Sequence, residues 1–78
     1  MAEVLDEHAE LAKADADIAA GERRVAEQIE LIEWLAKHHH DTAMAEQLLR
    51  VFEQTLDAWR EHRQLILGAI ARQEGPQP

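Results

Sequence analysis

The chain has no cysteine and no tyrosine, and it contains only one phenylalanine, two tryptophans, three glycines and two prolines. Without cysteine, neither disulfide bonds nor thiolate-bound metals are available to stabilise so small a fold. No uninterrupted apolar run approaches the ~18 residues needed to cross a bilayer. The sequence therefore predicts a small protein without a membrane span that depends on the packing of aliphatic side chains.

Positive charge is also scarce. Eight Lys and Arg residues stand against sixteen Asp and Glu, and the first forty residues hold most of the resulting net charge of −8. A surface this acidic repels phosphate backbones and anionic lipid, which argues against nucleic-acid and membrane partners. The N-terminal residues are acidic where a signal peptide would be basic, so we expect a cytoplasmic protein.

What remains is the composition of a helical protein. The 78 residues suffice for one small domain, and Ala, Leu, Ile, Val, Glu, Gln and Arg dominate them. Two proline-free segments predict helices over residues 3–38 and 42–72, joined by a turn at 39–41 with Asp41 or Thr42 as helix cap. We therefore predict one helical hairpin over residues 1–74, followed by a disordered tail over 75–78 that contains two prolines.

Apolar residues recur every seven positions in the first predicted helix. They are Val4, Leu11, Ile18, Val25 and Ile32. Such a strict repeat predicts a coiled-coil-like seam with left-handed supercoiling. The companion row of this seam is apolar at Ile29 and Ala36 but polar at His8, Asp15 and Glu22. Gly21 either allows close approach of a neighbouring helix or marks a weak point.

The second predicted helix has two apolar series. The first contains Ala45, Phe52, Trp59 and Ile66, widened by Leu49, Leu56 and Ile70, and the second contains Met44, Val51, Ala58 and Leu65. We expect Phe52 to be fully buried. Together the two series span an arc of about 200°, whereas one partner helix needs a stripe only somewhat over ~100° wide.

This excess of apolar surface predicts a second contact. On the first helix, Leu31, Trp34 and Leu35 point away from the predicted seam. We therefore predict an all-α fold of two long antiparallel helices, of which two copies associate into a four-helix bundle. The predicted interface comprises Leu31, Trp34, Leu35, Met44, Val51, Ala58 and Leu65.

Three consecutive histidines, His38, His39 and His40, are candidate metal ligands. Successive helical residues point about 100° apart, so the three cannot bind one ion while helical. In a non-helical turn, two of them with Asp41 form a possible ligand set. Their spacing matches no zinc motif, and structural zinc usually has four protein ligands with cysteine common among them. We favour a polar turn and predict neither a metal nor another cofactor.

Asp15, Glu22, His62 and Arg63 form a second group of interest. If the hairpin pairs residues whose numbers add to about 80, the two carboxylates face the segment from Trp59 to Leu65. They then form either ion pairs that fix the register or an acid–base pair with the histidine. Catalysis requires a pocket, and two packed helices offer none of the usual size, so we favour ion pairs and predict no enzymatic activity.

Three segments resemble a group of small uncharacterised bacterial helical proteins. They are Gly21-Glu22-Arg23-Arg24-Val25, the run from Ile29 to Leu35, and Asp41-Thr42 followed by Ala45, Leu48, Leu49 and Phe52; His62-Arg63 resembles the end of that pattern. The resemblance implies a hairpin of unknown function and brings no catalytic residues.

Two functions fit these features. The first is a non-catalytic interaction or structural protein that forms a homodimer through its apolar helix faces. The alternative is a small regulator whose hairpin binds a helix of a larger signalling or transcription protein.

Overall fold

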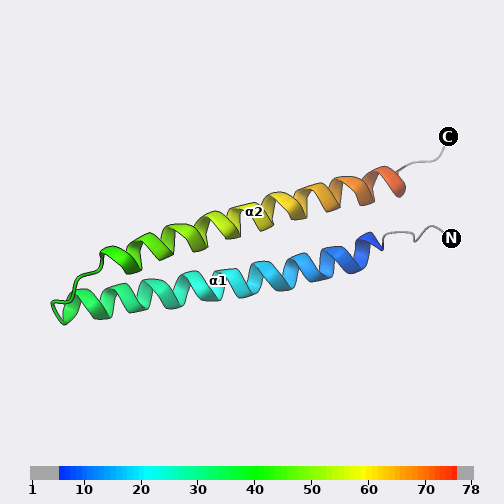
Figure 1. The fold of residues 1–78 in the computed structure, drawn as a ribbon. Coiled ribbons are helices and arrows are strands. Elements are labelled where there is room, and N and C mark those ends of the chain that lie inside the picture. The colour runs from blue at the N-terminus through cyan, green and yellow to red at the C-terminus, as the bar shows by residue number, and fades with distance from the viewer. Residues whose placement is uncertain (1–5, 76–78) are drawn as a thin grey trace.

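The computed structural model describes residues 6–75. It contains two helices, α1 (Glu7–Lys37) and α2 (Ala43–Gln73), which run antiparallel side by side so that the described chain begins and ends at the same end of the hairpin (Figure 1). The predicted all-α hairpin is therefore confirmed. Neither of these helices is long and apolar enough to cross a membrane.

The helix ends follow from local capping. The carboxylate of Asp6 accepts a hydrogen bond from the backbone N–H of Ala9 (3.1 Å) at the start of α1, where acidic residues also suit the helix dipole. The predicted start near residue 3 and the seam residue Val4 lie outside the described residues, as does the predicted tail beyond Gly75. Helix α1 ends at Lys37, one residue before its predicted end, whereas α2 begins and ends one residue later than predicted.

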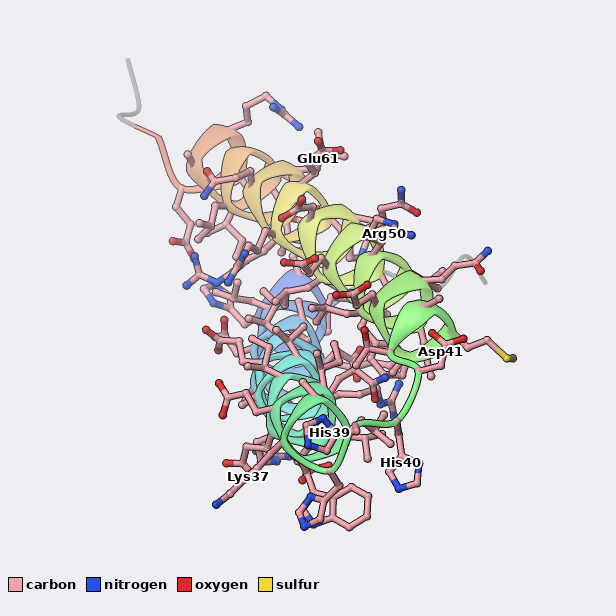
Figure 2. All side chains as sticks on the ribbon, turned by 90° about the vertical axis from the view of Figure 1, so that its left-hand side faces the viewer. Lys37, His39, His40, Asp41, Arg50 and Glu61 are labelled. Atoms are coloured by element: carbon pink, nitrogen blue, oxygen red, sulfur yellow. The ribbon has the colours of Figure 1, made fainter. Side chains whose placement is uncertain are left out.

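The turn is a Schellman motif with histidine where glycine is usual. The N–H of His40 bonds to the carbonyl of Leu35 (2.8 Å), and the N–H of His39 bonds to that of Ala36 (3.1 Å). This geometry requires a left-handed residue, and His39 adopts φ 60°. The side chain of Asp41 then accepts from the N–H of Ala43 (2.9 Å), so the predicted capping role belongs to Asp41. Figure 2 shows this end of the hairpin.

The predicted seam of α1 is wrong by part of a turn. The residues most deeply buried against α2 are Ala14 (1% exposed) and Gln28 (8%), which share a seven-residue row with Gly21. The leading predicted row, from Leu11 to Ile32, is partly buried beside it, whereas Ile29 of the companion row is exposed. A Cβ on Gly21 would lie 3.2 Å from Cδ1 of Leu56, so the predicted close approach at this glycine is confirmed.

The first apolar series of α2 faces α1, as predicted. Ile66 of that series and the adjoining Leu56 are buried. The prediction for Phe52 is wrong, because its side chain is only partly buried and lies beneath the guanidinium of Arg24, 5.6 Å from the ring centre. Leu56 packs against Gly21 instead, and Phe52 lies at the margin of the contact.

The core of this hairpin is small. Among the described residues, the buried apolar side chains are Ala14, Leu56 and Ile66, and no large side chain is completely enclosed. A folded domain usually retains only 5–15 kcal/mol of stability, roughly in proportion to what it buries. Because so few apolar side chains are buried, much of the apolar surface lies outside the contact between the two helices.

Candidate functional site

The hairpin has two edges of different character. On α1, Asp15 and Glu22 each follow a residue of the Ala14–Gly21–Gln28 row by one position, which places them about 100° to one side of it. Leu31 follows Gln28 by three positions and therefore lies on the other side. The ion-paired edge comprises His8, Asp15, Glu22, Arg60, Arg63 and Glu74. The apolar edge comprises Leu31, Met44, Leu48, Val51, Ala58 and Leu65.

The ion-paired edge carries three contacts that cross from α1 to α2. Nε of Arg63 donates to Oδ1 of Asp15 (2.5 Å), and Nη2 of Arg60 lies 3.6 Å from Oε2 of Glu22. Near the open end, Nε2 of His8 lies 2.7 Å from Oε1 of Glu74. In each pair the residue numbers add to between 78 and 82, so the predicted register near 80 is confirmed.

The contact between His8 and Glu74 affects proton binding. The hydrogen bond to the Glu74 carboxylate is the main reason that the pKa of His8 is raised above its ordinary value, and the charge of that carboxylate adds to the effect. Both side chains are well exposed. The pair therefore favours the charged imidazole at a solvent-exposed site.

The structure separates the residues of the possible acid–base group. Asp15 pairs with Arg63, whereas Glu22 pairs with Arg60, a residue that the sequence analysis missed although it fits the same register. His62 lies toward the other edge, where its ring meets that of Trp59 edge-on with centres 5.6 Å apart. The carboxylates of Asp15 and Glu22 thus form ion pairs with arginines, whereas His62 contacts Trp59.

The apolar edge is exposed over much of the hairpin. Met44 is 85% exposed and Leu65 72%, and Leu31, Leu48 and Val51 are each close to half exposed. Near the turn, Leu31, Met44, Leu48 and Val51 border an open groove of about 430 Å³ between the helices. Its lining residues are Gln28, Leu31, Met44, Ala45, Gln47, Leu48 and Val51.

Gln28 fixes the floor of this groove. Its side-chain Nε2 donates to the backbone carbonyl of Ala45 (2.9 Å), which ties the middle of α1 to the first turn of α2. The sequence analysis did not assign a role to Gln28 and did not include Leu48 in the predicted interface. The sequence contains a signal for each residue. Gln28 continues the seven-residue row of Ala14 and Gly21, and Leu48 lies between the two apolar series of α2.

Two residues of the predicted interface lie elsewhere. Leu35 is partly buried on the same row as Gly21 and Gln28, so its predicted orientation away from the seam is wrong. Trp34 is 52% exposed, but its ring stacks on those of His38 and His40, with centres 4.2 Å and 5.7 Å apart. Trp34 therefore forms a cluster with the histidines of the turn.

The three histidines take different positions in the turn. Nδ1 of His38 donates to the carbonyl of Trp34 (2.8 Å), His40 packs on the tryptophan ring, and His39 occupies the left-handed position (Figure 2). Within residues 6–75, no group of three or more His, Cys, Asp or Glu side chains is placed to hold a metal ion. The geometry therefore assigns structural contacts to this turn.

No family model matches the chain, and no significant match is found among curated proteins or solved structures. The resemblance to small bacterial helical proteins thus stays a prediction. The candidate site consequently rests on the geometry of the apolar edge.

Proposed function

We propose that this chain is a non-catalytic interaction module of the cytoplasm, and that two copies associate through their apolar edges into a coiled-coil-like four-helix bundle. The observation that carries this proposal is the exposed row from Met44 to Leu65, which continues across the groove to Leu31. Contiguous exposed apolar surface of this kind usually marks an interface in a small protein.

The exposed area supports a second copy as the partner. A folded monomer of this mass is expected to expose about 4,800 Å². The chain exposes 6296 Å². The excess of roughly 1,500 Å² reflects the elongated shape of the hairpin, and an interface of ordinary size, with ~800 Å² from each partner, fits within it. Self-association is the simplest way to cover it, because a homodimer requires no other component.

The test is sedimentation equilibrium of the wild type and of the variant Val51→Glu/Leu65→Glu. We expect a dimer at micromolar concentration for the wild type and its dissociation in the variant, because burying carboxylates opposite one another is costly. The matched control is Ala12→Glu/Ala26→Glu, which adds the same charge to exposed positions on the side of α1 away from α2. The control should remain a dimer.

A wild-type protein that stays monomeric and fully helical well below micromolar concentration would contradict the proposal. The groove formed by Leu31, Met44, Leu48 and Val51 would then be better explained as the docking site for an amphipathic helix of a larger regulatory protein.

A further inference from the structure

The two ends of the apolar edge have complementary shapes. The groove lies near the turn, around Leu48 and Val51, whereas Leu65 projects from the same edge of α2 farther toward the open end. The three seven-residue rows that begin at Met44, Gln47 and Leu48 form this side of α2. Up to Ala69 they include a single charged residue, Glu61, in a chain of which 31% is charged.

We infer that the dimer, if the proposed function holds, is antiparallel and seats Leu65 of each copy in the groove of the other. A two-fold axis crossing α2 near Leu56 and Asp57 brings the α2 helices of the two copies together in opposite directions. Residues that face each other then have numbers adding to about 113. This symmetry uses the groove and the projecting leucine twice, as an isologous contact requires.

This register forms four kinds of pair along the contact. Leu48 faces Leu65 of the second copy, Met44 faces the small Ala69, and Val51 faces His62. At the axis, Thr55 faces Ala58, so the smallest pair lies where the helices cross. Small residues at a crossing allow close approach of the two backbones, and larger residues fill the space as the helices diverge.

The other symmetric arrangement fits less well. A two-fold axis along the helices would place α2 over α1 of the second copy. At the hairpin register near 80, Leu65 would then lie over the segment of α1 that contains Lys13 and Asp17. Burying a leucine against these charged groups deprives them of water. The antiparallel arrangement instead places Leu65 on the groove that Leu31, Met44, Leu48 and Val51 line.

The register can be measured at its rim, where the numbers of neighbouring residues add to 115 because this row precedes the central row by one position. There, Gln54 of each copy lies beside Glu61 of the other. Because the protein contains no cysteine, single cysteines can be introduced without background. We would mix Gln54→Cys with Glu61→Cys and treat the mixture with a short bis-maleimide. The expected product is the mixed cross-linked dimer. Each variant alone should cross-link poorly, since an offset of seven helical residues adds about 10 Å.

The control mixture is Ala12→Cys with Ala26→Cys, which should give no cross-linked product. A dimer in sedimentation whose Gln54→Cys protein cross-links to itself as readily as to Glu61→Cys would overturn the register and leave the proposed function standing. A dimer that cross-links at neither rim position would do the same. A monomer in sedimentation would overturn both proposals.

A second measurement uses charge. Gln54→Arg places a cation opposite Glu61 of the second copy at two symmetric sites, and exposed pairs of this kind should tighten the dimer about two- to ten-fold. Adding Glu61→Gln should remove the gain. An unchanged dissociation constant in Gln54→Arg would contradict the inferred pairing.

Discussion

The two edges of this hairpin satisfy their side chains in different ways. On the ion-paired edge, Asp15, Glu22 and His8 each meet a partner on α2 within the same chain. On the apolar edge, Met44 and Leu65 remain mostly exposed. Paired charged groups remain compatible with water, so the ion-paired edge is satisfied within one chain. Apolar side chains gain free energy only when another surface covers them.

The largest effect within the hairpin is expected at the contact that holds the two edges together. Gly21→Val should lower stability by about 1–3 kcal/mol, because even the Cβ would lie 3.2 Å from Leu56 and the branched side chain would force the helices apart. Urea denaturation at fixed protein concentration measures the change.

The matched control is Ala12→Val, at an exposed position on the side of α1 away from α2. The change in stability there should stay within about 0.7 kcal/mol, the ordinary difference in helix propensity. Equal losses in the two variants would show that the close approach to Leu56 does not determine the result.

A smaller effect is expected on the ion-paired edge. The side chains of Arg63 and Asp15 are 35% and 53% exposed. A double-mutant cycle with Asp15→Asn and Arg63→Gln should therefore give a coupling below about 1 kcal/mol. The coupling should shrink further in 1 M salt, where the Debye length is about 3 Å. Association through the apolar edge should not weaken under the same conditions, and a parallel loss would contradict the division between the edges.

The smallest effect concerns His8. Its pKa is raised by Glu74, so the stabilisation from this pair is fully present below the pKa of the unfolded chain and is lost as pH rises through the higher pKa of the folded state. An NMR titration of the imidazole should show a pKa above the ordinary 6.5, and Glu74→Gln should lower it. An identical titration curve in both proteins would show that the contact does not persist in solution.

Some features of the sequence correctly predicted which apolar side chains are exposed. The second apolar series of α2 was expected to point away from α1, and Met44, Val51 and Leu65 are exposed there. The reason is that residues seven positions apart point within about 20° of one another on a helix, independently of what packs against it. Cross-helix ion pairs were predictable for the same reason, since the short turn fixes which residues of α1 and α2 lie at the same height.

Local periodicity, capping and chain length predict that two helices form, where the chain turns between them and which residues lie level across the hairpin. The row of α1 that faces α2 is not predictable in this way, because it depends on how the two helices pack. The sequence pattern favoured Ile18, Val25 and Ile29 for their hydrophobicity, but the row at the centre of the contact contains Ala14, Gly21 and Gln28. Closely packed helices place small residues on the line of contact and large ones beside it, and that choice depends on the shape of the opposing Leu56.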